Sequence, residues 1–135
     1  MSSEPTRLQL LDAARAVRLR AHAPYSHFLV GAALLAEDGR IITGCNVENA
    51  SYGLTICAER SALVKGVSEG CNKYRCIAVV TDAPTSTPPC GACRQLLWEL
   101  AGDVEVILGN LTAETASFRM SQLLPYPFDV RSLER

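Results

Sequence analysis

The chain has 135 residues, of which 48% are hydrophobic and 20% are charged, and its formal net charge is −1. This length and composition are typical of one globular domain, so we expect a single domain over 1–135. The near-neutral charge argues against a nucleic-acid-binding protein, and no apolar stretch is long enough to cross a bilayer. We therefore expect a small-molecule ligand, with no nucleic acid and no membrane among the partners.

The N-terminal stretch and the cysteines bear on the compartment. Residues 1–7 carry two charged side chains and lack the apolar core of a signal peptide, so we expect a cytoplasmic protein. Thiols stay reduced in the cytoplasm. The six cysteines are therefore expected to serve metal binding or catalysis rather than a disulfide framework.

In chain order, the first expected element is a helix over 4–21, with Pro5 in its first turn and Pro24 marking its end. A hairpin follows, and the remaining elements alternate between helices and strands. The ranges are strands at 29–36 and 41–44, a polar loop at 46–55, a helix at 57–69, a strand at 76–81, a proline-rich loop at 82–88, a helix at 90–101, a strand at 104–108, a weak strand at 116–119 and a short helix at 120–124. Strands separated by helices favour a layered α/β fold, and the hairpin makes its sheet mixed.

Three cysteines have the spacing of a catalytic metal site. Cys57, Cys90 and Cys93 open two of the expected helices, and three thiolates leave the fourth tetrahedral position of a zinc ion for water. Glu59 follows Cys57 by two residues, where it can face that water without being a ligand. A carboxylate in this position is suited to general acid–base catalysis.

Two arginines are expected to support the metal ligands. Three thiolates and one Zn²⁺ sum to a charge of −1, which weakens the ion as a Lewis acid. Arg60 and Arg94 follow Cys57 and Cys90 by three and four residues, so they lie on the same helical faces. We expect them to donate hydrogen bonds to the thiolates, and the positive helix N-termini to act in the same direction.

Other interpretations of the cysteines remain open. A Cys-x-x-Cys pair alone is also typical of a redox pair or of half a structural zinc site. A structural module would need four protein ligands, for which Cys45 is the candidate, and Glu59 would be dispensable. Cys71 and Cys76 are expected to be inert, the latter as a small hydrophobic residue in a strand.

The cysteine pattern also carries a resemblance to a known family. Zinc deaminases have His or Cys, then x-Glu, and later Pro-Cys-x-x-Cys, which stand here at 57–59 and 89–93. The chain resembles the small homotetrameric zinc-dependent cytidine deaminase family over nearly its full length. The matching stretches are PYSHF at 24–28, GCNVENA at 44–50, ICAER at 56–60, PCGACRQ at 89–95 and LLP at 123–125, followed by Phe128. The resemblance implies a three-layer α/β/α sandwich with a mixed, about five-stranded sheet and zinc at the starts of two helices.

The resemblance also implies roles for single residues. Asn46 and Glu48 would bind the ribose hydroxyls, Phe28 would pack near the pyrimidine, and the Ala58 backbone N–H would hold the base carbonyl. Tyr52 and Phe128 would reach the site of a neighbouring subunit. Taken without the resemblance, the polar residues are more typical of a solvated loop and the phenylalanines of simple packing.

The function implied by the resemblance is hydrolytic deamination of free cytidine and 2'-deoxycytidine to uridine and 2'-deoxyuridine, with release of ammonia. One Zn²⁺ per subunit would activate water, and Glu59 would shuttle the protons. Such a homotetramer would serve pyrimidine salvage. The alternatives are a related zinc deaminase acting on an aminoglycosyl-nucleoside antibiotic such as blasticidin S, or on cytosine within a polynucleotide. The Asn46-x-Glu48 pair and the near-neutral charge favour a free nucleoside, and neither selects between ribose and deoxyribose.

Overall fold

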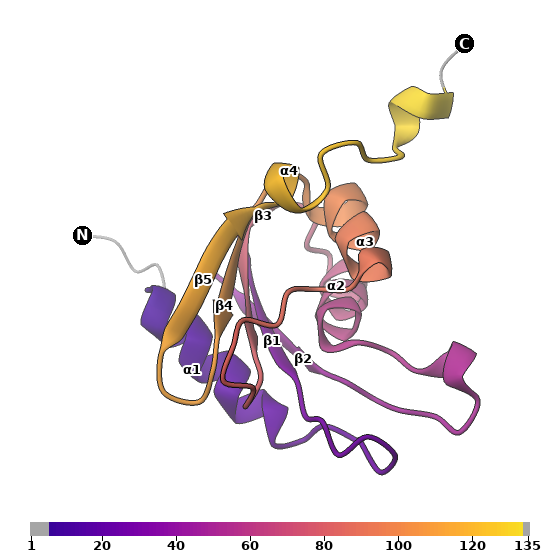
Figure 1. Ribbon diagram of the computed structural model, residues 1–135. Coiled ribbons are helices and arrows are strands. Elements are labelled where there is room, and N and C mark those ends of the chain that lie inside the picture. The colour runs from indigo at the N-terminus through magenta and orange to yellow at the C-terminus, as the bar shows by residue number, and fades with distance from the viewer. Residues whose placement is uncertain (1–5, 134–135) are drawn as a thin grey trace.

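The computed structural model describes residues 6–133 and contains a five-stranded sheet between helices (Figure 1). The strands are β1 (Gly31–Ala36), β2 (Ile41–Cys45), β3 (Tyr74–Val80), β4 (Glu105–Gly109) and β5 (Glu114–Arg119). The α-helices are α1 (Arg7–Arg18), α2 (Ala58–Ser68), α3 (Gly91–Ala101) and α4 (Met120–Leu123), and two 3₁₀ turns are η1 (Tyr52–Leu54) and η2 (Val130–Leu133).

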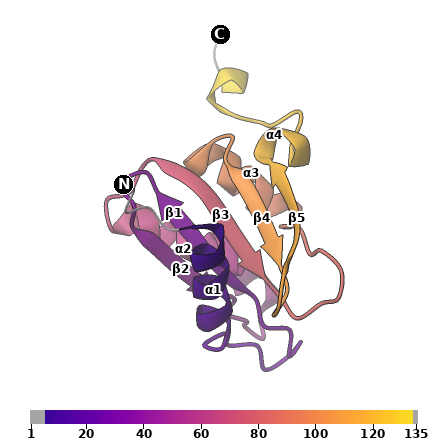
Figure 2. The same cartoon turned by 90° about the vertical axis from the view of Figure 1, so that its left-hand side faces the viewer.

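The strand order is β2-β1-β3-β4-β5, and only β3 and β4 are parallel. Helix α1 covers one face of the sheet, and α2 and α3 cover the other, as Figures 1 and 2 show from two directions. The expected three-layer sandwich with a mixed sheet is therefore confirmed. No helix within residues 6–133 is long and apolar enough to span a membrane.

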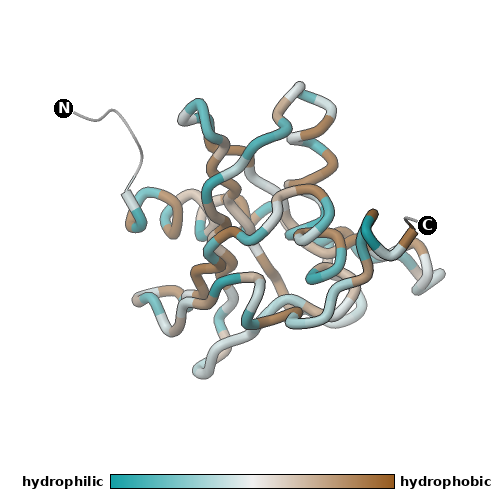
Figure 3. Tube along the Cα trace, turned by 90° about the horizontal axis from the view of Figure 1, so that it is seen from above, coloured by the Kyte–Doolittle hydropathy of each residue, from teal (hydrophilic) through white to brown (hydrophobic). Residues whose placement is uncertain are grey.

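The central strands are buried on both faces. Alternate residues of β1 enter two different cores, with Leu34 on the side of α2 and α3 and Leu35 on the side of α1. This burial explains why the strands have continuous apolar runs rather than an alternating pattern. Figure 3 shows the most hydrophobic stretches of chain passing through the interior.

The first helix is shorter than the predicted range 4–21. It begins after Thr6, whose side chain accepts from the Gln9 N–H in a capping box. Pro5, expected in the first turn, lies outside the described residues. It ends at Arg18 rather than near Pro24, because His22 leaves the helical path and pairs with Val47 in an isolated β-bridge.

The predicted strand at 29–36 also begins later, at Gly31. The preceding residues are engaged elsewhere: the Leu29 carbonyl accepts from the Arg18 side chain, and the Val30 N–H donates to Asn46. Neither 3₁₀ turn was predicted: η1 lies within the expected polar loop at 46–55, and η2 lies beyond the last expected helix. The other predicted elements are present with shifted ends.

Helix α2 packs closely on β2 at Gly44. A Cβ atom at this position would lie 2.4 Å from the Ala62 nitrogen and 2.7 Å from the Ala58 carbonyl oxygen. Only glycine permits this approach, because both neighbouring atoms belong to helix backbone. The contact therefore sets the position of the first turn of α2.

Candidate metal centre

Three thiols converge where α2 and α3 begin. Cys57 and Cys90 are the N-cap residues of these helices, and Cys93 lies in the first turn of α3. Their sulfur atoms all lie within 4.8 Å of one another. A tetrahedral zinc ion with Zn–S distances of about 2.3 Å holds its sulfurs roughly 3.8 Å apart, so this donor set fits zinc with little adjustment.

A fourth protein ligand is not present in the described part of the chain. Within residues 6–133, the only group of three or more metal-ligating side chains is Cys57, Cys90 and Cys93. Cys45, the candidate fourth ligand, lies on β2 opposite Gly31 and is outside this group. Three protein ligands leave one position open, which is the arrangement of a catalytic zinc ion.

The helix starts provide positive potential at the sulfurs. Cys57 and Cys90 both have extended backbone dihedrals, and no side chain caps either helix. The first-turn N–H groups therefore have no partners inside their helices and can stabilise negative charge beside the thiolates.

The closeness of the thiols changes their acidity. Hydrogen bonds from Cys93 and Cys90 lower the pKa of Cys57 to about 6, against the opposing effect of burial, and the positive charge of Arg60 contributes. The hydrogen bond with Cys57 raises the pKa of Cys93, as does burial. Cys57 is thus readily available as a thiolate, the form that binds metal.

Glu59 is the buried carboxylic acid of the site. It is the second residue of α2, with 5% of its surface exposed, and it lines the same cavity as Cys57 and Cys90. Burial raises the pKa of this carboxyl to about 7, with a smaller contribution from the charge of Cys57. Near neutral pH such a group can both accept and donate a proton.

The cavity at the thiols has a volume of about 250 Å³. Its wall brings together residues from five parts of the chain. The lining residues are Phe28, Val30, Asn46, Thr55, Ile56, Cys57, Ala58, Glu59, Val79, Thr81, Thr87, Pro88 and Cys90. Of the residues expected to bind substrate, Phe28, Asn46 and Ala58 are in this wall.

Two hydroxyl side chains of this wall, Thr81 and Thr87, were not predicted as site residues. Thr81 precedes the proline-rich loop at 82–88, and Thr87 lies near the end of that loop. The sequence signal that could have located them is position: Thr81 directly follows a buried strand, and Thr87 stands three residues before Cys90.

Asn46 is buried and holds the neighbouring segment in place. Its Nδ2 donates to the Phe28 carbonyl at 2.8 Å, and its Oδ1 accepts from the Val30 N–H at 2.9 Å. The amide keeps one N–H and one lone pair for a ligand. Without the resemblance this residue was expected to be solvated, and the structure instead buries it.

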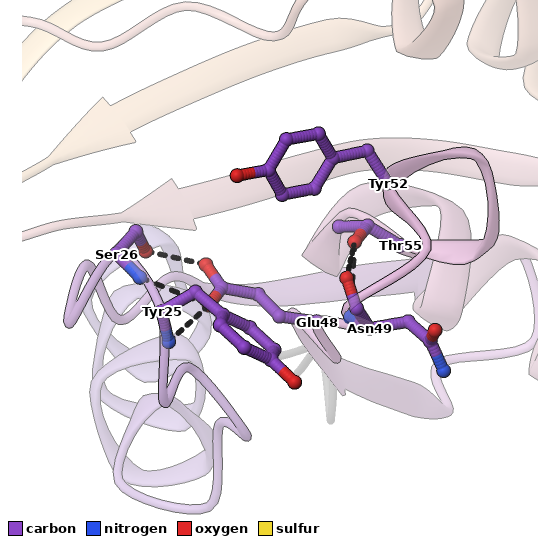
Figure 4. Close-up of a pocket in the computed structure, with 6 residues that line it drawn as sticks. All are labelled: Tyr25, Ser26, Glu48, Asn49, Tyr52 and Thr55. Atoms are coloured by element: carbon purple, nitrogen blue, oxygen red, sulfur yellow. Dashed lines mark hydrogen bonds between the residues drawn. The ribbon is translucent and has the colours of Figure 1, made fainter.

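Glu48 and Tyr52 line an adjoining pocket of about 420 Å³ (Figure 4). The carboxylate of Glu48 accepts from the Tyr25 N–H at 3.0 Å and from both the N–H and the hydroxyl of Ser26. The hydrogen bonds from Ser26 hold the pKa of Glu48 below its usual value. Thr55 lines both pockets, so the two adjoin at this residue.

Phe128 lines neither pocket. It is 60% exposed and belongs to the C-terminal segment, which extends beyond α4 on the side away from η1 (Figure 1). This segment is attached to α3: Trp98 Nε1 donates to the Asp129 carboxylate at 3.1 Å, and Gln95 Nε2 donates to the Phe128 carbonyl.

The two arginines donate to backbone carbonyls. Arg60 donates to the Thr55 carbonyl at 3.0 Å, and Arg94 donates to the Pro89 carbonyl at 2.7 Å and to the Leu123 carbonyl at 2.9 Å. The expected hydrogen bonds to the thiolates stay a prediction, and the positive charge of Arg60 acts on Cys57. Both guanidinium groups reach past the cysteine to the backbone just before it, so they fix the segments that carry the thiols.

Comparison with known proteins gives concordant matches. The family described as the cytidine and deoxycytidylate deaminase zinc-binding region matches residues 5–110. The chain is 50% identical to a cytidine deaminase of Halalkalibacterium halodurans, covering 94% of this chain and 97% of the relative. It is 44% identical to one of Sporosarcina psychrophila, covering 93% of each. The crystal structure of a cytidine deaminase from Burkholderia pseudomallei superposes with a TM-score of 0.89 at 46% identity, over 92% of this chain and 100% of that one.

Proposed function

This chain belongs to the cytidine and deoxycytidylate deaminase zinc-binding family, and on that premise we propose that it converts free cytidine and 2'-deoxycytidine to uridine and 2'-deoxyuridine with release of ammonia. It is a zinc-dependent hydrolytic deaminase. The observation that carries the proposal is the convergence of three thiols, two of which line one cavity together with the buried Glu59, while Cys45 is outside the group. The relatives at 44–50% identity are named cytidine deaminases, so action on an antibiotic is not favoured.

Cys57, Cys90 and Cys93 would hold the zinc ion, one per subunit. Zinc bound there supplies a Lewis acid that makes water a nucleophile near neutral pH. Glu59 accepts a proton from the water and delivers it to N3 of the cytosine ring. It then carries the second proton to the amino group at C4, which leaves as ammonia. One buried carboxyl thus performs both acid and base steps, and water and cytidine give uridine and ammonia in balance.

The cavity wall positions the base. The Ala58 N–H is the first of α2 and has no acceptor within the helix, so it is free to donate to the pyrimidine carbonyl. Phe28 provides an apolar surface for the ring and helps to exclude water from the site. Exclusion of water strengthens the electrostatic interactions that Glu59 makes with the substrate.

The sugar lies at the junction of the two pockets in this proposal. Asn46 offers its remaining N–H and lone pair from one pocket, and Glu48 offers its carboxylate from the other. An amide and a carboxylate are suitable partners for two neighbouring hydroxyls. The support is that Asn46 lines one pocket, Glu48 lines the other, and Thr55 lines both.

Sites shared between subunits of a homotetramer account for two exposed aromatic side chains. Tyr52 is 83% exposed and Phe128 is 60% exposed. Large apolar groups on a surface favour a contact with another chain. Size-exclusion chromatography combined with an activity assay over a dilution series tests this: an active monomer would contradict both the assembly and the role of Phe128.

The cellular setting follows from the chemistry. The reaction recovers a uracil nucleoside from a free cytosine nucleoside, which is a step of pyrimidine salvage. Six cysteines are free thiols, and a reducing compartment keeps such thiols available to a metal. This supports a cytoplasmic location.

The test is ammonia release from cytidine, deoxycytidine, cytidine monophosphate and blasticidin S by the zinc-loaded protein. Glu59→Gln should lose at least about 100-fold in kcat while it retains zinc, because general acid–base catalysis is typically worth roughly 10²–10⁴-fold. Glu99→Gln, at an exposed position of α3, is the matched control and should be fully active. Activity of Glu59→Gln within tenfold of wild type would remove the proton shuttle from the proposal.

A further inference from the structure

Two threonine hydroxyls in the cavity wall have no part in the reaction proposed above. Thr81 follows β3 and is 2% exposed, while Thr87 is half-buried, and both line the cavity that holds Cys57 and Glu59. Their Oγ1 atoms lie 3.3 Å apart, within hydrogen-bond distance. Most of their neighbours in the wall are apolar, so a hydroxyl there is a feature that a ligand would meet.

The surroundings of Thr81 fix the direction of the hydrogen bond between the two. The Thr81 oxygen already accepts from the Ala83 N–H at 3.3 Å. Its own proton is buried and needs an acceptor, since an unpaired buried donor costs about 1–3 kcal/mol. In the described part of the chain, Thr87 Oγ1 is the partner available to it. Thr81 therefore donates to Thr87, which leaves the Thr87 proton free for another acceptor.

The loop that carries Thr87 is anchored at both ends. At its start, Asp82 lies 3.4 Å from the guanidinium of Arg18, which also donates to the Leu29 carbonyl. Near its end, the Ser86 hydroxyl donates to Thr115 at 3.1 Å. These contacts tie the loop to α1, to the segment before β1 and to β5, so the Thr87 hydroxyl is held in position before a ligand arrives.

We propose that Thr87 is a specificity-determining residue, whose hydroxyl donates a hydrogen bond to an acceptor atom at the base end of the bound pyrimidine nucleoside, with Thr81 orienting that hydroxyl. The proposal rests on the proposed function for the identity of the ligand. Thr87 lines the cavity of Cys57, Glu59 and Cys90 and does not line the adjoining pocket of Glu48, whereas Thr55 lines both, so we assign Thr87 to the base rather than to the sugar.

The experiment compares Thr87→Val, Thr87→Ser and Thr85→Val in the full chain. Valine keeps the shape of threonine and removes the hydroxyl, and serine keeps the hydroxyl. Thr85 lies on the same loop, is exposed and lines neither pocket, so Thr85→Val is the matched control. The readouts are kcat and KM for cytidine, zinc content, melting temperature, and the Kd of the metal-free protein for uridine.

We expect Thr87→Val to raise the Kd for uridine and to lower kcat/KM about three- to tenfold, the usual effect of one lost neutral hydrogen bond, at unchanged zinc content. Its melting temperature should fall, because the buried Thr81 hydroxyl loses its acceptor. Thr87→Ser and Thr85→Val should stay within about twofold of wild type. Thr81→Val should weaken uridine binding less than Thr87→Val, because the hydroxyl remains but is no longer oriented.

Three results would overturn the inference. Unchanged kcat/KM and Kd in Thr87→Val would show that the hydroxyl meets no ligand atom. An equal loss in Thr87→Ser would assign the effect to the methyl group, and an equal loss in Thr85→Val would assign it to the loop as a whole. Failure of the proposed function is distinguishable: wild type would then release no ammonia from cytidine, whereas uridine binding still reports on Thr87.

Discussion

Replacement of Gly44 by alanine tests whether the contact between β2 and α2 sets the geometry of the metal centre. The added Cβ would lie 2.4 Å from the Ala62 nitrogen, whereas ordinary contacts begin at 3.4 Å. The difference means that α2 must move away from the sheet by about 1.0 Å, or that β2 must bend by a similar amount. Neither side can adjust by a rotamer change, because the neighbouring atoms are backbone.

The cost has two parts. Overpacking of a filled core destabilises by roughly 1–3 kcal/mol, and a backbone clash belongs at the upper end of that range. About 3 kcal/mol corresponds to a melting temperature lowered by roughly 10 °C for a domain of this size. The displaced helix carries Cys57 and Glu59 at its start, and a displacement of about 1 Å in catalytic groups can cost on the order of 100-fold in rate.

The assay is thermal unfolding of the metal-free proteins, followed by zinc affinity in chelator competition and kcat for cytidine. Gly53→Ala is the control for stability, because a Cβ there meets no atom within 4 Å. We expect Gly44→Ala to unfold at a clearly lower temperature, to bind zinc more weakly and to turn over more slowly. If Gly44→Ala and Gly53→Ala melted together, the argument that α2 is held by this contact would be refuted.

Two further predictions concern the metal ligands and the acid stability. Cys93→Ser should bind zinc at least about 100-fold more weakly, because loss of a residue that only hydrogen-bonds to a ligand already costs roughly 10–100-fold in metal affinity. Cys45→Ser should bind zinc as wild type does. Equal losses of affinity in the two variants would support a site with four cysteine ligands. Hydrogen bonds from Ser117 and Arg7 lower the pKa of Glu105 in the folded state. The ionised carboxylate therefore stabilises the fold at pH values above the pKa of Glu105 in the unfolded chain. This stabilisation is lost as the pH falls below about 4 and the carboxylate is protonated. Arg7→Ala should therefore melt below wild type at pH 7, with a difference that narrows by pH 3, and a gap that is constant with pH would contradict this.

The pairing of Cys57 with Glu59 and of Cys90 with Cys93 could be predicted from the sequence because each pair is local, whereas the meeting of the two pairs was implied only by the family resemblance. Cys57 and Glu59 lie in one helical turn, and Cys90 and Cys93 lie in another, so spacing alone places each pair. The layered fold could be predicted for a related reason, since continuous apolar runs and helical periodicity are short-range signals.

The remaining features depend on contacts between distant segments. Arg60 and Arg94 share helical faces with their cysteines, but helical spacing gave no sign that they also donate to the Thr55 and Pro89 carbonyls. Thr81 and Thr87 line the cavity, and the loop between them is held by contacts to Arg18 and Thr115, which are far away in sequence. The end of α1 is likewise set by the bridge between His22 and Val47, which no local pattern could indicate.

The placement of the three thiols has a consequence for motion within the molecule. A metal ion bound to Cys57, Cys90 and Cys93 would cross-link α2 to α3 on one face of the sheet, while α1 on the other face has no ligand. Local opening of α2 and α3 would then require the metal to dissociate, and opening of α1 would not. Backbone amides of α2 and α3 should therefore exchange hydrogen more slowly when zinc is present. Those of α1 should exchange at nearly the same rate with and without zinc.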